Sequence, residues 1–436
     1  MIEDAALDLL ARETLARNDR GGYSVPNAAV YPFQWNWDSA FVAMGFASFD
    51  EDRAWRELET LFLGQWPDGM VPSIIFHKPD AGYYPGPDAW GTAHAPPTTG
   101  ISQPPVAATA ARAILEAARD KAAARRHARD LFLRLFSWHR WWHEIRDPDA
   151  TGLVTVIHPW ETGRDNSPEW DAPLANVTPR VNVAKLRRDK THVNAAERPT
   201  DDFYNRVITL VEEARALAWS GKAVARGLSF RVCDIGVQSI LMRADRDLLA
   251  LAQSLGFSEE AQRLRAWIDR ARAAFGRLKH ADGSFRSLDL NSSSLAPMKT
   301  SASFLPLYAR VCDQDDADRL ARELERWRAA ARYAVASTDP GAVEFDPDRY
   351  WRGPVWLVVN RMIADGFAAY RHHVSAEIIR AGSRELAQRH GLREYYDPRD
   401  GKGLGGKDFS WSAAVWLSWL TQARSSDQGR DLITPA

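Results

Sequence analysis

Helical periodicity extends through most of this chain and constrains its fold more than any other feature. Apolar residues recur on one helix face in charged stretches that are rich in Ala, Leu, Arg and Glu. These amphipathic stretches lie near residues 3–18, 51–65, 105–121, 124–146, 205–226, 257–277, 316–333 and 374–390. More uniformly apolar helices are expected to begin near residues 38, 235, 301, 354 and 409. The pattern predicts an all-α fold.

The apolar and the amphipathic helices alternate, and this alternation predicts how they pack. A helix that is apolar on all sides is buried, whereas an amphipathic helix covers it. About a dozen helices would form an inner ring of apolar helices inside an outer ring of amphipathic ones, a toroid of helical hairpins. The loops before the apolar helices would then meet at one end and bring together Asp38, Gln103, Asp165, Gly353 and Glu394.

Strand signals are few and short. Residues 70–76 (MVPSIIF) and 152–157 (GLVTVI) are expected to form minor β-hairpins in loops. Strands do not alternate with helices, and no Gly-rich phosphate loop is present, which disfavours a dinucleotide-binding fold.

Two long irregular segments interrupt the helices, at residues 77–104 and 166–204. Loops of this length in a compact domain are usually functional or disordered, so we expect them to form walls or lids of a ligand site. No linker divides the chain, which predicts one domain over residues 1–436 with a peripheral tail after about residue 424.

Charge and cysteine content exclude several classes of partner. The 56 Lys and Arg residues balance 57 Asp and Glu residues, which argues against a nucleic acid or an anionic membrane as partner. The N-terminus is acidic and amphipathic, unlike a signal peptide, and no run of about 18 apolar residues could span a membrane. Cys233 and Cys312 are the only cysteines, so a disulfide framework or a Cys-based zinc site is not expected. We expect a cytoplasmic protein and leave homo-oligomerisation open.

Tryptophan is unusually abundant, with 18 residues, and many stand beside Asp, Gln and Gly in loop-like segments. A single Trp most often serves the core. Clusters of this kind instead favour sugar chemistry, because aromatic faces cover the apolar side of a pyranose while carboxylates bind its hydroxyls and move protons.

Asp165 is the first candidate catalytic carboxylate. Gly163 and Pro168 prevent a regular helix around it. Hydrolysis of an acetal needs an acid to protonate the leaving oxygen, and the apolar surroundings of Trp160 and Trp170 would raise the carboxyl pKa to suit that role. The alternative is that Asp165 caps a helix or turn.

Glu394 is the second candidate and is expected between a helix that ends near residues 390–391 and a turn in YYDPRDG. Its predicted role is that of a general base, which activates water on the opposite face of the sugar. The alternative is an exposed glutamate at a helix terminus.

Two further segments are candidates for sugar binding. In WNWD, Trp35 and Trp37 flank Asn36 and lead to Asp38, whose carboxylate would bind two adjacent hydroxyls unless it only caps a helix. In YWRGPVW, a Gly-Pro pair fixes a loop and opens a helix, so that two Trp side chains approach a ligand while Arg352 reaches a neighbouring carboxylate.

Other motifs carry less chemistry. His139 and His143 lie one helical turn apart, but no Glu completes an H-E-x-x-H arrangement, so we expect no metal. The GLGG stretch at residues 403–406 is expected to be a flexible turn.

Five segments, taken in order, resemble the motif series of glycoside hydrolase family 63. They are YPFQWNWDSAF, GISQPP, WETGRDNSPEWD, YWRGPVW and REYYDPRDGKGLGGKDFSWSAAV. The similarity extends from about residue 23 to residue 420 and is greatest to the short bacterial mannosylglycerate and glucosylglycerate hydrolases. It implies an (α/α)6 barrel and an inverting α-glycosidase without a cofactor, with Asp165 as general acid and Glu394 as general base.

The resemblance also implies substrate-binding residues. Those of the sugar subsite are Tyr31, Trp35, Trp37, Asp38, Gln103, Trp160, Gly353, Trp356 and Trp411. Arg198 and Tyr204, joined by Tyr83, would hold the aglycone, since a guanidinium can bind the carboxylate of glycerate in bidentate fashion. Asn36, Gly163, Arg164, Tyr350 and Trp351 stand within the same motifs and complete the candidates.

The predicted function is hydrolysis of a small α-glucoside or α-mannoside by an inverting exo-α-glycosidase, with glucosylglycerate or mannosylglycerate as substrate. Phe409 departs from the family pattern, since some members are expected to place a polar side chain there beside the catalytic water. An α-glucosidase or trehalase-like hydrolase is therefore an alternative. The alternatives from other classes are a sugar epimerase, which would need His residues as acid and base, and a non-catalytic sugar-binding protein.

Overall fold

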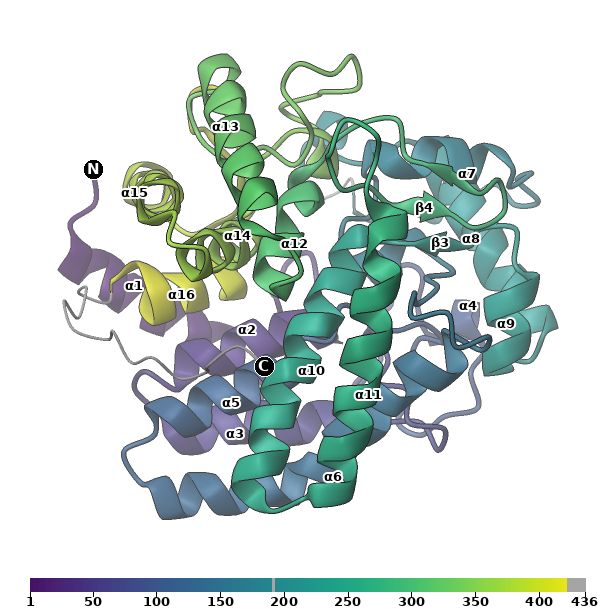
Figure 1. Ribbon diagram of the computed structural model, residues 1–436, viewed down its shortest axis with the longest axis horizontal. Coiled ribbons are helices and arrows are strands. Elements are labelled where there is room, and N and C mark those ends of the chain that lie inside the picture. The colour runs from purple at the N-terminus through teal and green to yellow at the C-terminus, as the bar shows by residue number, and fades with distance from the viewer. Residues whose placement is uncertain (190–192, 422–436) are drawn as a thin grey trace.

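The computed structural model describes residues 1–189 and 193–421 and is built mainly of helices (Figure 1). The tail that the sequence predicts after about residue 424 lies outside the described residues.

An inner ring of helices closes on itself. Each of its helices contacts the next one, and the last contacts the first. In chain order they are α2 (Asn36–Phe46), α5 (Ala107–Ala117), α10 (Ile235–Leu255), α12 (Leu305–Ala309), α14 (Leu357–Ala369) and α16 (Ser410–Val415).

Amphipathic helices surround this ring (Figure 1). They are α1 (Asp4–Asn18), α3 (Glu51–Leu61), α6 (Lys121–Ile145), α11 (Ser258–Ala274), α13 (Gln314–Ala330) and α15 (His373–His390). Apart from the stretches at residues 105–121 and 205–226, the helices alternate between inner and outer positions as expected.

One helix of the ring differs from the sequence-based expectation. Residues 105–121 were predicted to form an outer helix, but α5 packs between α2 and α10. Its buried residues are mostly alanines, and small side chains let neighbouring helices approach without the bulky apolar surface that marks other inner helices.

The stretch near residues 205–226 also differs, because it forms two helices. These are α8 (Asp201–Ala216) and α9 (Gly221–Gly227), separated by Ala218 and Trp219 in left-handed backbone conformation. With α4 (Pro87–Trp90) they belong to a second, smaller hydrophobic cluster beside the ring. One further short helix is α7 (Asp171–Ala175).

Single-turn 3-10 helices connect several elements, and a π-helix follows α16. The 3-10 helices are Phe62–Gly64, Pro159–Thr162, Pro168–Trp170, Ala195–Glu197, Phe275–Leu278, Ser301–Phe304 and Tyr350–Arg352, and the π-helix is Trp416–Leu420.

The strands are short and antiparallel. They are β1 (Gln34–Trp35) with β2 (Ile74–Ile75), β3 (Val232–Cys233) with β4 (Leu288–Asp289) and β5 (Ser294–Leu295), and β6 (Arg393–Tyr396) with β7 (Gly403–Lys407).

The predicted hairpins at residues 70–76 and 152–157 are wrong. The first segment pairs with the strand that precedes α2, and the second forms a single bridge from Val156 to Val232. A short strand pairs with a segment that can lie far away in the sequence, so the local sequence does not predict its partner. Hairpins form instead from β4 with β5 and from β6 with β7, and the latter contains Glu394.

The main hydrophobic cluster includes side chains from Leu7 to Leu420, so both ends of the described chain share one core. Several tryptophans, among them Trp55, Trp138, Trp142 and Trp416, are fully buried within it. Much of the tryptophan content therefore serves packing.

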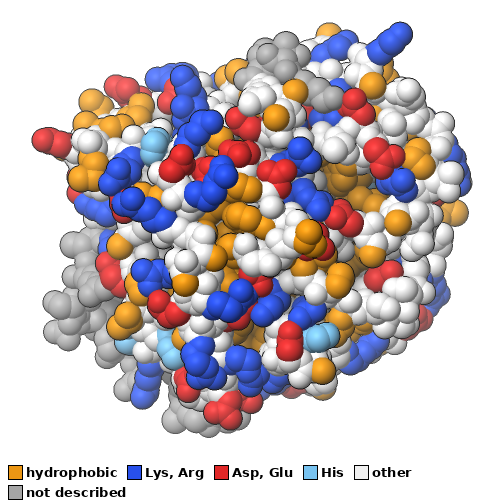
Figure 2. All heavy atoms as spheres, turned by 90° about the horizontal axis from the view of Figure 1, so that it is seen from above, with side chains coloured by type: hydrophobic (Ala, Val, Ile, Leu, Met, Phe, Trp, Pro, Cys, Tyr) orange, Lys and Arg blue, Asp and Glu red, His pale blue; other side chains and the backbone are white. Residues whose placement is uncertain are grey.

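Surface charge follows the balanced composition. On the face drawn in Figure 2, basic and acidic side chains are interspersed. None of the helices in the described residues is long and apolar enough to cross a membrane.

Candidate active site

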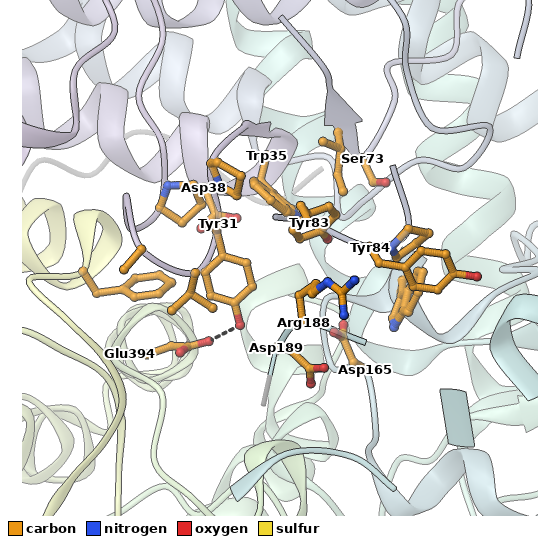
Figure 3. Close-up of a pocket in the computed structure, with 18 of the residues that line it drawn as sticks. Tyr31, Trp35, Asp38, Ser73, Tyr83, Tyr84, Asp165, Arg188, Asp189 and Glu394 are labelled. Atoms are coloured by element: carbon orange, nitrogen blue, oxygen red, sulfur yellow. Dashed lines mark hydrogen bonds between the residues drawn. The ribbon is translucent and has the colours of Figure 1, made fainter. Parts of the chain in front are cut away.

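A cavity of about 240 Å³ lies beside the N-terminal ends of four inner helices, and Figure 3 shows residues that line it. Asp38 is in the first turn of α2, Gln103 precedes α5, Tyr350 precedes α14, and Trp411 is in the first turn of α16. Segments far apart in the sequence thus meet around one space, as the helix order predicted.

Most of the predicted site residues line this cavity. They are Tyr31, Trp35, Trp37, Asp38, Tyr83, Gln103, Trp160, Gly163, Asp165, Arg198, Tyr204, Tyr350, Glu394 and Trp411. The residues predicted to bind the sugar and those predicted to bind the aglycone therefore line the same cavity.

Five predicted residues lie behind the lining rather than in it: Asn36, Arg164, Trp351, Gly353 and Trp356. The Asn36 amide donates to the backbone carbonyls of Val71 and Pro72, at 3.3 and 3.2 Å. Its side chain therefore joins the start of α2 to the segment that contains Val71 and Pro72.

The two tryptophans of YWRGPVW support the cavity wall from behind. Trp351 and Trp356 stack with their ring centroids 3.8 Å apart, and Trp356 packs edge-on against Tyr350 and Trp411. Both supported rings line the cavity.

Gly353 allows this segment to turn, because a Cβ atom there would lie 2.4 Å from the carbonyl oxygen of Asp346. Arg352 forms a bidentate ion pair with Asp171, at 2.9 and 2.8 Å, which confirms that it reaches a neighbouring carboxylate.

Arg164 is enclosed by two carboxylates. Its guanidinium, which is almost fully buried, pairs with Glu169 and with Asp234 at the start of α10. The arginine therefore joins the loop of Asp165 to the inner ring.

Asp165 occupies a loop that glycine makes possible. Gly163 has a φ of +67°, and a Cβ atom there would lie 2.6 Å from the ring of Trp37. Burial, opposed by the charge of Arg198 and reinforced by Glu394, raises the pKa of Asp165 to about 7. The flanking 3-10 helices have His158 and Ser167 as their caps, so Asp165 caps neither helix.

Glu394 lies on β6 and is 1% exposed, so the alternative of an exposed helix terminus is wrong. The Tyr31 hydroxyl donates to its Oε1 at 2.8 Å, and the backbone N–H of Gly406 donates to its Oε2 at 2.9 Å. Arg198 Nη1 lies 3.9 Å from Oε1. Burial raises the pKa of Glu394 above its ordinary value, although these partners oppose the change.

The GLGG stretch is part of this arrangement and not a flexible turn. It lies in β7, and Gly405 has a φ of +64°. A Cβ atom there would lie 2.5 Å from Oε2 of Glu394. Sequence reasoning missed this role because the contact forms only when β6 and β7 pair.

Asp38 is nearly buried on α2, whose cap is Trp35, so Asp38 is not a helix cap. Burial and the nearby charge of Glu394 raise its pKa well above the ordinary value. Gln103 accepts a hydrogen bond from the backbone N–H of Trp37 at 3.3 Å, which ties α2 to the segment before α5.

Sequence reasoning also missed several lining residues, among them Ser73, Tyr84, Arg188 and Asp189. Arg188 and Asp189 belong to the long polar loop at residues 166–204, which was expected to form a wall of the site. Their place in this loop is the one sequence feature that pointed to them.

Phe409 lies 4.7 Å from Trp411 and 5.9 Å from Tyr31, measured between ring centroids. The cavity wall is therefore apolar where some family members were expected to carry a polar group.

The histidines of HRWWH lie elsewhere. His139 and His143, both buried on α6, each contact one oxygen of Asp245 on α10, at 2.7 and 2.9 Å. The pair therefore joins an outer helix to an inner one. Among the described residues, no group of His, Cys, Asp and Glu is arranged to hold a metal ion.

Comparison with known proteins agrees with this geometry. Residues 31–412 match the mannosylglycerate hydrolase MGH1-like glycoside hydrolase domain. The chain is 47% identical over 413 residues to mannosylglycerate hydrolase of Thermus thermophilus, covering 94% of this chain and 99% of the relative. It is 35% identical over 428 residues to glucosylglycerate hydrolase of Mycolicibacterium hassiacum, covering 93% and 96%.

A solved structure is similar over the same extent. The crystal structure of GH63 mannosylglycerate hydrolase from Thermus thermophilus, in complex with Tris and D-glycerate, matches with a TM-score of 0.92 and 46% identity. The match covers 95% of this chain and 99% of that chain. The chain is therefore a glycoside hydrolase and belongs to the mannosylglycerate hydrolase MGH1-like family.

Proposed function

We propose that this enzyme hydrolyses a small α-mannoside or α-glucoside with inversion, and that its substrate is mannosylglycerate or glucosylglycerate. The closed ring of helices would be an (α/α)6 barrel, and the whole chain would form one catalytic domain. The observation that carries the proposal is a pair of carboxyl groups, Asp165 and Glu394, that face one aromatic-lined cavity from opposite sides (Figure 3).

Asp165 is assigned as the general acid. With a pKa of about 7, much of it keeps its proton near neutral pH and can pass it to the glycosidic oxygen as the bond breaks. A carboxyl group with an ordinary pKa would already be ionised and could not do so.

Glu394 is assigned as the general base. Its two hydrogen-bond donors, Tyr31 and Gly406, each hold one carboxylate oxygen and so fix the orientation of the group. A water molecule on the far side of the sugar would lose its proton to Glu394 while it attacks the anomeric carbon. Inversion requires the two carboxyl groups about 6.5–9.5 Å apart, with the water between one of them and the sugar.

The aromatic lining is assigned to the sugar. Trp35, Trp37, Trp160 and Trp411 present ring surface to the cavity, and Asp38 and Gln103 supply polar groups for hydroxyls. Trp351, Trp356 and Gly353 would act indirectly, by supporting this wall.

The aglycone is assigned to Arg198 and Tyr204, with Tyr83 beside them. Glycerate carries a carboxylate, and a guanidinium next to a phenol hydroxyl is suited to bind it. The related enzymes whose names include mannosylglycerate and glucosylglycerate, one of them solved with D-glycerate, support this choice.

The other function classes receive less support. A sugar epimerase would need histidine as acid and base, but the described cavity lining contains none, and His158 is buried behind Trp160. A trehalase-like substrate stays a candidate because Phe409 makes part of the wall apolar.

Time-resolved proton NMR tests the proposal. Incubation with mannosylglycerate, glucosylglycerate and trehalose should release the β-anomer first from one of the glycerate glycosides. Initial release of the α-anomer would disprove inversion, and hydrolysis of trehalose alone would disprove the aglycone.

The roles of the two carboxyl groups are tested by Asp165→Asn and Glu394→Gln. Each should lower kcat by roughly 100-fold or more, the usual contribution of a general acid or base. Asp202→Asn removes the same charge from an exposed position on α8 and serves as the matched control. Near-normal kcat in either active-site variant would remove that residue from the mechanism.

A further inference from the structure

Asp189 is a carboxylate in the cavity wall to which the proposed chemistry gives no task. Its side chain is 12% exposed and lies in the long loop between α7 and α8. Figure 3 shows it beside Arg188 and on the same side of the cavity as Asp165. A buried charge of this kind is costly unless it is paired, so its partners indicate what it does.

Arg187 fixes the orientation of Asp189. Its guanidinium forms a bidentate pair with both carboxylate oxygens, at 3.0 and 2.7 Å. The side chain of Arg187 is fully buried and also donates to the carbonyl oxygen of Pro199 and to Asp201, at 2.9 and 2.8 Å. Bidentate pairs of this type are geometrically specific, so Asp189 is held in one position.

The carboxylate in turn contacts both residues assigned to the aglycone. Its Oδ2 accepts a hydrogen bond from Nε of Arg198 at 3.2 Å and from the hydroxyl of Tyr204 at 3.3 Å. Arg187 also lies over the ring of Tyr204, 3.8 Å from its centroid. Arg187, Asp189, Arg198 and Tyr204 therefore form one connected unit.

A second nitrogen atom of Arg198 contacts the catalytic side of the cavity. Nη1 donates to the hydroxyl of Tyr31 at 3.0 Å and lies 3.9 Å from Glu394. Arg198 is thus held at one edge by Asp189 and at another by the group that orients the base. Its position between the two sides depends on both contacts.

We propose that Asp189 is the positioning residue that makes this site specific for a carboxylate-bearing aglycone. It holds the guanidinium of Arg198 in place so that the remaining N–H groups can donate to a carboxylate of the substrate, and it fixes Tyr204, whose hydroxyl donates to Asp189, beside that guanidinium. The inference rests on the proposed function and deepens it.

The negative charge of Asp189 is essential to this role. Arg187, Arg188 and Arg198 all lie close to it, and without an anion between them the like charges of Arg187 and Arg198 would repel each other. Although burial opposes ionisation, the hydrogen bond from Arg187 and the charge of Arg198 keep the pKa of Asp189 below its ordinary value. The carboxylate therefore stays charged at neutral pH.

Asp189→Asn tests the proposal, because it keeps the size of the side chain and removes the charge. Titration calorimetry with D-glycerate should give a Kd about tenfold higher than that of the wild type, the effect of losing one hydrogen bond to a charged group. The KM for the glycerate glycoside should rise by a similar factor, whereas kcat should change by less than about threefold because the sugar site is intact. Asp202→Asn is the control and should match the wild type in both assays.

The outcomes separate this inference from the proposed function. If the wild type binds D-glycerate and Asp189→Asn binds it equally well or more tightly, Asp189 does not position the aglycone site. A lower kcat and a lower melting temperature, with KM unchanged, would give Asp189 a structural role only and would also overturn the inference. Failure of the wild type to bind D-glycerate would overturn the proposed aglycone itself, and with it this role.

Discussion

Replacing Asp165 by Asn should stabilise the enzyme at alkaline pH while it lowers kcat by roughly 100-fold or more. The pKa of this carboxyl is about 7 in the folded protein, against an ordinary value of 3.8 that applies to the unfolded chain. Between these values the folded protein keeps a proton that the unfolded chain has lost. The wild type therefore loses stability as the pH rises from 4 to above 7, and Asn, which does not ionise, removes this loss.

The magnitude follows from the two pKa values. They differ by about three units, and each unit corresponds to about 1.4 kcal/mol, so the variant should gain about 4 kcal/mol over the wild type by pH 8. For 436 residues the entropy of unfolding is about 0.9 kcal/mol per kelvin, so this gain corresponds to a rise in Tm of about 5 °C. At pH 4 the two proteins should differ little.

Differential scanning calorimetry of both proteins at pH 4 and pH 8 measures the effect. The exposed Asp202→Asn variant controls for the loss of one carboxylate and should show no such growth of its Tm difference with pH. A Tm difference between Asp165→Asn and the wild type that is the same at both pH values would refute the raised pKa, and with it the argument that Asp165 is the acid.

Three further predictions concern the catalytic pair. The value of kcat/KM should fall as the pH rises above about 7, because Asp165 loses its proton. It should also fall as the pH is lowered, because Glu394 gains a proton, and the midpoint of this acid limb should lie above the ordinary pKa of 4.5. A profile that is flat from pH 6 to 9 would contradict the first assignment. Tyr31→Phe removes a hydroxyl that donates to Glu394 at 2.8 Å, so the acid limb of the profile should move to higher pH and kcat should fall roughly tenfold. An unmoved limb would mean that this hydrogen bond does not stabilise the anion. Gly405→Ala places a Cβ atom 2.5 Å from the Glu394 carboxylate and should lower kcat by about a hundredfold, whereas Gly256→Ala, at a similar positive φ with no atom within 4 Å, should keep full activity in the same assay.

The helices could be read from the sequence because their signal is local. Periodic apolar residues mark the buried face of each outer helix, and uniformly apolar stretches mark the inner ones. The exception is α5, whose buried face consists mostly of small alanines and whose sequence therefore predicts an amphipathic outer helix. It belongs to the inner ring because it packs between α2 and α10, and these contacts cannot be predicted from the residues of α5 alone.

The candidate site was predictable only in part, because tryptophan serves both packing and binding. Trp35 and Trp37 line the cavity, whereas Trp351 and Trp356 stack behind it, although all four stand in similar aromatic segments. Whether a tryptophan lines the cavity or packs behind its wall depends on the tertiary structure and not on the residues next to it in the sequence.

The sequence by itself determined where most of the long helices form and which two carboxylates stand in aromatic segments, since both depend on residues that are close along the chain. Only the tertiary structure decided how these groups are held. Gly406 reaches Glu394 because two strands pair, and Asp189 links Arg198 to Tyr204 because a long loop folds back over the cavity. Such contacts join residues whose distance along the chain says nothing about their distance in space, and for that reason they could not be predicted.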